Sequence, residues 1–385
     1  MIFINKINGI DEQNEYIKLN KIKVNCYVKN KIHIFFYIVL LLIAINLFLK
    51  TKILRISEKE LENLVIFLKN NLTKNRKNIK NKKIRAKKLE NCEKKEMLQL
   101  YIENRTQFYI KGRQEIMKSI WSKYNDSNIK TFQDKINWLL IHDSSELKSH
   151  IVDKILLREY SKKILGKDIC VPIIKIYNNI NKININELPE KFVLNCNHGS
   201  GMNIICNNKT KFNISNAKEK LNKWMKINYG LEYYEYQYIH IKRKIFAEIF
   251  LKDNITDYKF YCFNGNPKLI KVQSNYIGNI KMYHYYDLNW TITDIETNLT
   301  WNIKISSVKF PRPKYLQLMI NYAKKFSRYF TFVRVDLYEF NETVYLSELT
   351  FSPANAMSPY KDEKQRIYLG NLLDLSKVIS KNNSL

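Results

Sequence analysis

The sequence is poor in residues that interrupt or cross-link a chain. Only 9 glycines and 7 prolines occur among 385 residues, which excludes collagen-like and Gly/Pro-rich low-complexity proteins. The 6 cysteines are dispersed, with no C-x-x-C pair and no Cys/His cluster at metal spacing. The cysteines therefore predict neither a disulfide scaffold nor a structural zinc site, and they favour a reducing compartment.

Acidic residues are also scarce, because 36 Asp and Glu face 65 Lys and Arg, a formal net charge of +29. A charge of this size predicts an anionic partner, whether a phosphate ligand, a membrane or a nucleic acid. More than half of the excess falls in residues 1–130. The hydrophobic fraction of 45% is enough for one or two domains with a core, and it excludes wholesale disorder.

One long apolar run, residues 32–49, follows an N-terminal tail of residues 1–31 and is interrupted only by His33 and Asn46. At about 1.5 Å per residue it just spans a hydrocarbon core, so we predict a transmembrane helix and a single-pass membrane protein. A buried core helix is the alternative.

A basic block, residues 74–88, lies in a juxtamembrane, partly helical linker of residues 50–130. It lacks interleaved aromatic residues on which bases could stack, so contact with anionic headgroups is favoured over nucleic acid. The excess of Lys and Arg after the apolar run predicts a cytosolic main body, with a lumenal type II arrangement as the alternative.

From about residue 131 the pattern becomes mixed α/β (α+β), and we place one domain at 131–373 and a tail at 374–385. Apolar periodicity predicts helices at residues 138–142, 152–164, 214–227 and 314–327. Strand patterns occur at residues 191–197, 244–250, 258–263 and 269–273, with a hairpin of 332–339 and 344–350 turned at Asn341.

Two motifs contain candidate functional residues. The expected strand at 191–197 runs into His198-Gly199-Ser200-Gly201, whose backbone N–H groups could wrap a phosphate; an ordinary turn is the alternative. His198 could contact that phosphate or simply shape the loop.

The hairpin is the second motif. Arg334 and Asp336 share one face of its first strand, and Glu348 and Thr350 share one face of the second. Paired across the turn, they put two carboxylates and a cation over one spot, which suits Mg²⁺ bound to nucleotide phosphates. A surface charge pair on a half-exposed hairpin is the alternative.

Several ordered stretches make the domain recognisable, namely TFQDKINWLLIHD, DKILLREY, ELPEKFVLNCNHGSGMNIIC, DYKFYCFNGNPKLIKV, FTFVRVDLY and YLSELTFSP. From about residue 131 to 373 the chain resembles the TupA-like branch of the ATP-grasp superfamily. The resemblance implies two α+β subdomains that clamp ATP, and a reaction in which ATP phosphorylates a carboxylate that an amine or similar nucleophile then attacks. It suggests, by analogy, a carboxylated sugar or peptide as substrate.

The resemblance also assigns roles to single residues. Asp336 and Glu348 would hold Mg²⁺, and Arg334 would be the catalytic cation against the transferring phosphoryl group. The nucleotide would lie against Lys154, His198, Gly199, Ser200, Gly201, Asp257 and Lys259, with its adenine on the hinge residues Glu248, Ile249 and Leu251.

Departures from the family pattern leave catalysis uncertain. The family strand FVLK carries a lysine to the phosphates, and here that place is Asn195. Lys191 lies four residues back, about 13 Å along a strand, too far to replace it. The family turn PGSG reads Pro353-Ala354-Asn355-Ala356. Two hypotheses therefore stand, a membrane-anchored ligase and a degenerate ATP-grasp domain that binds nucleotide or polymer without catalysis.

Overall fold

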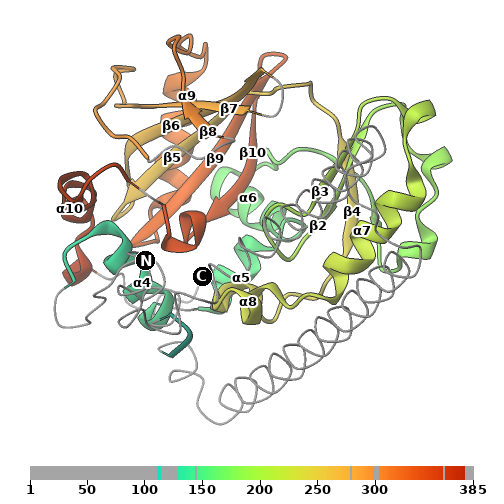
Figure 1. Ribbon diagram of the computed structural model, residues 1–385, viewed down its shortest axis with the longest axis horizontal. Helices are drawn as coiled ribbons and strands as arrows, with labels where there is room; N and C mark the ends of the chain where they lie inside the picture. Colours follow the sequence, from blue (N-terminus) through green and yellow to red (C-terminus); the bar gives the residue numbers. More distant parts are fainter. Residues whose placement is uncertain are drawn as a thin grey trace, which may run out of the picture. The chain divides into compact units, whose positions relative to one another are not determined.

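The computed structural model describes residues 111–113, 129–143, 145–277, 280–297, 303–358 and 360–377, which belong to one compact unit of the chain (Figure 1). The expected N-terminal tail, the apolar run at 32–49 and the basic block at 74–88 lie outside these residues. Within the described ranges, no helix combines the length and the apolar character needed to cross a bilayer.

Two separate sheets organise the unit. The smaller sheet has the order β1-β4-β2-β3, and every pairing in it is antiparallel. Its strands are β1 (Ile173–Tyr177), β4 (Ile245–Ile249), β2 (Phe192–Cys196) and β3 (Asn203–Cys206). Helix α7 (Ile214–Lys226) places Leu221 in the core of this sheet, next to Leu194 and Ala247.

The larger sheet has six strands in the order β10-β9-β5-β6-β7-β8, and only the short β8 runs parallel to its neighbour. Its strands are β5 (Asp257–Phe263), β6 (Asn266–Ile277), β7 (Ile280–Tyr286), β8 (Ile303–Ile305), β9 (Phe332–Phe340) and β10 (Thr343–Thr350). One face packs against α6 (Leu157–Leu165) and α9 (Leu316–Ser327), where Phe260, Val335 and Phe326 are fully buried.

The other face of the larger sheet is shared between a second core and an open surface. At one end α4 (Phe132–His142) and α10 (Glu363–Asn371) cover an aromatic cluster, in which the Phe132 ring lies 5.1 Å from that of Phe332. The rest of this face stays uncovered by helices and carries the polar residues described below.

The remaining helices of the described residues are short. They are α5 (Glu146–Val152), α8 (Tyr229–Glu232) and the 3₁₀ turns Ile180–Lys182, Ile185–Glu187, Lys209–Lys211, Tyr236–Tyr238, Pro353–Ala356 and Leu375–Lys377.

The expected α+β elements are confirmed with one exception, the helix at 152–164. The chain breaks there because Asp153 accepts a hydrogen bond from the Ile155 N–H (2.8 Å) and from the Asn197 side chain (2.8 Å). These bonds draw the backbone out of helical geometry, as Asp side chains commonly do. Helix α5 therefore ends at Val152, and α6 begins only at Leu157.

Packing between α4 and α10 gives a first prediction. A Cβ on Gly370 would lie 2.2 Å from the Lys130 carbonyl oxygen, so Gly370→Ala should lower the free energy of unfolding by about 2 kcal/mol despite alanine's better helix propensity. Urea unfolding of the full chain measures this, with the exposed neighbour Asn371→Ala as control. Unchanged stability of Gly370→Ala would mean that the two helices do not pack this closely.

Candidate active site

A cleft of about 680 Å³ receives residues from both sheets. The smaller sheet contributes β2 and β4, and the larger sheet contributes the uncovered face of β5, β6, β9 and β10. The cleft therefore lies where the sequence motifs of the two sheets meet.

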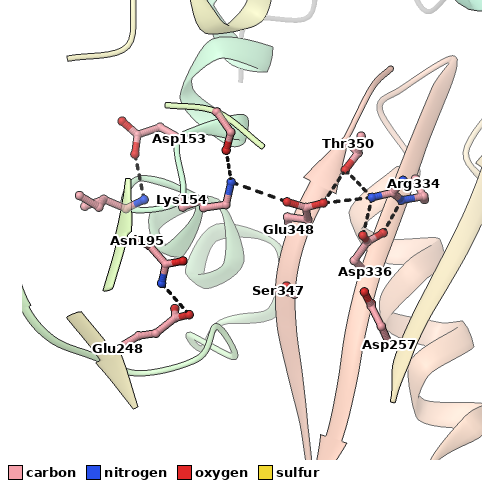
Figure 2. A network of polar contacts seen from close by, with 12 residues as sticks. Asp153, Lys154, Asn195, Glu248, Asp257, Arg334, Asp336, Ser347, Glu348 and Thr350 are labelled. Atoms are coloured by element: carbon pink, nitrogen blue, oxygen red, sulfur yellow. Dashed lines mark hydrogen bonds and ion pairs between the residues drawn. The ribbon is translucent and has the colours of Figure 1, made fainter. Parts of the chain in front are cut away.

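The β9–β10 hairpin places its charges together, as its sequence predicts. Arg334 donates to both Asp336 oxygens, with Nε to Oδ1 and Nη2 to Oδ2 each 2.6 Å (Figure 2). The same Nη2 donates to Glu348 Oε1 at 3.0 Å and to Thr350 Oγ1 at 3.1 Å. One guanidinium therefore holds both carboxylates at one point of the cleft.

A β-bulge decides which way Glu348 faces. Leu346 pairs with Leu337, but Glu348 pairs with Asp336, so β10 carries one extra residue, Ser347, at this place. Residues two apart on a regular strand share a face, and an extra residue breaks that alternation. Leu346 consequently packs in the hydrophobic core and reaches the cleft only as part of its apolar lining, while the Glu348 carboxylate joins Asp336 in the cleft.

Lys154 connects the hairpin to the glycine loop. It lies in the break between α5 and α6, where its Nζ donates to the Gly199 carbonyl at 2.7 Å and stands 3.7 Å from Glu348 Oε2 (Figure 2). The Lys154 backbone N–H donates to the Asn197 carbonyl, which ties the same turn to the loop.

The carboxylates of the hairpin have very different proton affinities. Asp336 is 1% exposed, and burial raises its pKa to about 6 against the charges of Arg334 and Lys259. Burial acts the same way on Glu348, but the charges of Lys154, Arg334 and Lys259 outweigh it and hold that pKa at about 2. Burial lowers the pKa of Lys259, but Asp257 and Asp336 outweigh this and raise it.

The donor set fits Mg²⁺. Mg²⁺ prefers oxygen ligands and is commonly held by one or two carboxylates together with substrate phosphates and waters. Asp336 and Glu348 supply two carboxylates, and the Thr350 hydroxyl lies 3.2 Å from Glu348 Oε1. A bound cation would also stabilise Asp336, whose burial disfavours its ionised form.

The hinge side of the cleft contains the pair that replaces the family lysine. Asn195 is 6% exposed, and its amide donates to Glu248 Oε1 at 2.8 Å (Figure 2). Burial raises the pKa of Glu248 to about 7. The Ile249 N–H donates to the Pro172 carbonyl at 3.0 Å, and Leu251 lines the cleft two residues further along the chain.

The structure brings the candidate residues together with two exceptions. The cleft is lined by Lys154, Ser200, Gly201, Glu248, Ile249, Leu251, Asp257, Lys259, Arg334, Asp336 and Glu348. His198 is instead buried, with its Nε2 3.2 Å from the Trp224 carbonyl oxygen. This position fits the alternative that His198 shapes the loop. Gly199 takes part through its carbonyl, which accepts from Lys154.

Sequence reasoning missed three polar residues on the larger sheet. Lys271 and Gln273 on β6 and Lys281 on β7 also line the cleft. Lys271 and Gln273 alternate with the buried Ile270 and Val272, so the period-two pattern of this strand contained the signal.

A buried polar cluster behind the cleft was also missed. Glu235, 3% exposed, accepts hydrogen bonds from Ser352 Oγ and, at 3.3 Å, from Gln237 Nε2. Arg113 contacts the residues that follow Ser352, because its Nη2 donates to the Asn355 carbonyl at 2.9 Å. No local pattern marks these partners, since Glu235 and Ser352 are 117 residues apart.

These contacts hold an unusual turn. Ala354, Asn355 and Ala356 have φ of 49°, 54° and 58°, the left-handed region that favours glycine. The family pattern has glycine in this turn, and here the backbone keeps a left-handed conformation with non-glycine side chains. Pro353 and Ala354 line the cleft, so the turn forms part of its wall.

The comparisons agree with this architecture. The sequence profile of the family described as TupA-like ATPgrasp matches residues 134–374, and this chain therefore belongs to that family, with an ATP-grasp α+β fold. No curated protein matched the chain.

Three solved structures are among those to which the chain is similar. D-alanine–D-alanine ligase from Bacillus anthracis complexed with ATP has 14% identity and a TM-score of 0.32, with 58% of this chain and 63% of that chain covered. L-amino acid ligase from Bacillus licheniformis has 11% identity and a TM-score of 0.39, with 66% and 57% covered. The RimK domain ATP-grasp protein from Sphaerobacter thermophilus has 9% identity and a TM-score of 0.32, with 59% and 68% covered. This chain thus spans less than two thirds of the two ligases.

The buried Glu235 predicts a pH dependence of stability. Burial raises its pKa from 4.5 to about 7 in the folded protein, so the folded state binds the proton more tightly than the unfolded state. The stabilisation is complete below pH 4.5 and is lost as the pH rises through about 7, by roughly 3 kcal/mol.

Glu235→Gln should remove this part of the pH dependence. Urea unfolding at pH 5 and pH 8 compares its slope with that of the wild type and of Glu342→Gln, an exposed control on the β9–β10 turn. Equal slopes in all three proteins would contradict the assignment of the proton to Glu235.

Proposed function

We propose that this protein is an ATP-dependent ligase that activates a carboxylate as an acyl phosphate and joins it to an amine or similar nucleophile. The observation that carries the proposal is the Arg334 guanidinium bonded to both Asp336 and Glu348 in a cleft that also contains the glycine loop and the hinge. ATP would lie between the two sheets, with its phosphates toward Lys154 and its adenine toward Glu248, Ile249 and Leu251.

The first step needs charge neutralisation more than acid or base catalysis. An oxygen of the substrate carboxylate attacks the γ-phosphorus of ATP, and the bond to the β–γ bridging oxygen breaks, which releases ADP. Arg334 and Lys259 stand where negative charge would gather on the transferring group. Asp336 and Glu348 would hold Mg²⁺, which neutralises phosphate charge when bound.

In the second step the nucleophile attacks the acyl carbon, inorganic phosphate leaves, and the attacking amine loses a proton. We propose a carboxylated sugar or peptide as the carboxylate substrate, by analogy with the family. The turn at residues 353–356 lies in the wall of the cleft, where it could contact this substrate.

Asn195 favours a second candidate function, nucleotide binding without catalysis. Its amide donates to Glu248, so an uncharged side chain stands where the family has a phosphate-binding cation. A protein with this pair would hold nucleotide or polymer while the transfer step fails.

We further propose that residues 32–49 anchor the protein in a membrane, with residues 74–88 on anionic headgroups and the catalytic domain in the cytosol. The length of the apolar run and the clustered charge support this proposal. Co-sedimentation of the full chain with anionic vesicles, lost on deletion of residues 32–49, would test it.

Removing the carboxylates tests the nucleotide site. Calorimetric titration of the full chain with a non-hydrolysable ATP analogue should show micromolar affinity that requires Mg²⁺. The Asp336→Asn, Glu348→Gln double variant should lose at least tenfold in affinity, because it removes the two charges that hold the metal. Glu339→Gln on the same hairpin is the control. Binding in the double variant equal to wild type would contradict the metal assignment.

Asn195→Lys separates the two candidate functions. A lysine restores a cation near the phosphates and should tighten binding of the analogue by about tenfold. ADP release in the presence of Mg²⁺-ATP and carboxylate substrates is then compared between the variant and wild type. Release by the wild type supports the ligase, whereas release only by the variant supports the non-catalytic binder.

A further inference from the structure

One row of directly opposed residues crosses the larger sheet at the proposed metal site. From β10 to β7 the row is Glu348, Asp336, Lys259, Lys271 and Tyr285. The first three members are mutually engaged, because Lys259 Nζ lies 2.8 Å from Asp336 Oδ2 and Arg334 joins Asp336 to Glu348. Two acids are thus followed by two lysines along the row.

Lys271 differs from Lys259 in its surroundings. Across the described ranges of the chain, no carboxylate oxygen lies within 4 Å of its Nζ. Its ammonium stands instead over two aromatic rings, 4.6 Å from the centroid of Tyr283 and 5.4 Å from that of Tyr285. Both tyrosines are 1% exposed, so a rigid aromatic floor fixes the position of this cation.

Several cations lie around Lys271. Burial, Lys259 and Arg334 lower the pKa of Lys271 to about 7; Asp257 opposes this effect, and Lys281 adds a smaller lowering effect. Lys281 lies on β7, on the same face as Tyr283 and Tyr285, and lines the same cleft. An anion bound at Lys271 would relieve its repulsion from the surrounding cations and restore its charge.

The nucleotide phosphates are not the anion that this position fits. Lys154 and the glycine loop approach the row from the β10 end, where Lys154 stands 3.7 Å from Glu348. Lys271 lies two strands beyond Asp336, on the far side of Lys259, which is about 10 Å at the usual strand spacing. The proposed site of phosphoryl transfer, at Arg334 and Asp336, therefore lies between Lys154 and Lys271.

We propose that Lys271, in a cleft that Lys281 also lines, binds a second anionic group of the substrate, a carboxylate or a phosphate in addition to the carboxylate that reacts. This inference rests on the proposed function, since it names the class of substrate that the same cleft accepts. The ligase would then act on a dianionic substrate, with one acid group at Arg334 and the other over the tyrosine floor.

Paired probes test the inference. The full chain is titrated with glutarate, with its monoamide glutaramate, which has the same carbon chain and one charge fewer, and with inorganic phosphate. Each titration is made with and without a saturating non-hydrolysable ATP analogue and Mg²⁺. The wild type should prefer glutarate by tenfold or more, as expected for an added charged hydrogen bond. Phosphate binding that persists beside the analogue would identify a phosphate as the preferred second group.

Three variants assign the preference to Lys271. Lys271→Met keeps a long apolar side chain over the tyrosines and should reduce the glutarate preference to near one, whereas Lys271→Arg should retain it. Lys268→Met, an exposed lysine on the same strand, should behave as wild type. A preference that survives in Lys271→Met, or that is absent in the wild type, would overturn the inference.

The proposed function can fail separately. Affinity for the ATP analogue should be the same in Lys271→Met and in wild type, because Lys271 lies outside the nucleotide-binding residues. Absence of analogue binding by the wild type would contradict the proposed nucleotide site. The titrations without nucleotide would still decide whether Lys271 selects the dianion.

Discussion

The bond between Arg334 and its two carboxylates is the constraint on which the site depends. Buried charges are tolerated when they are paired and hydrogen-bonded, and removing one partner leaves an uncompensated charge. Arg334, Asp336 and Glu348 satisfy one another across the β9–β10 hairpin, and Lys259 and Lys154 extend the network to β5 and to the glycine loop. The same contacts that stabilise the charges therefore set the distance between the elements that line the cleft.

Two features set the charge distribution along this network. On the nucleotide side, Asn195 bonded to Glu248 supplies no cation where the family pattern has a lysine. On the opposite side, Lys271 and Lys281 supply positive charge with no acidic partner for Lys271 among the described residues. The end of the cleft where the phosphates of ATP would lie thus has one cation fewer than the family pattern. Two lysines line the end of the cleft beyond Lys259.

The wall of the cleft is held from behind by residues far away in the sequence. Three consecutive non-glycine residues keep left-handed backbone at 354–356, which is unfavourable unless the surroundings fix it. Arg113 bonds to the Asn355 carbonyl, and Glu235 accepts from Ser352 at the start of the turn. A residue expected to belong to a linker therefore forms part of the same compact unit as the cleft, because Arg113 is fully buried against α4 and this turn.

The sequence alone determined the α+β class, most strands and helices, and the grouping of Arg334, Asp336 and Glu348, because strand periodicity and hairpin pairing are local properties. Tertiary structure decided three further features. Hydrogen bonds that Asp153 accepts broke an expected helix, a bulge at Ser347 brought Glu348 to Asp336 in the cleft, and the β5–β6 register put Lys271 beside Lys259. These features depend on which distant groups come into contact in the folded protein. Such contacts cannot be predicted from the spacing of residues along one chain.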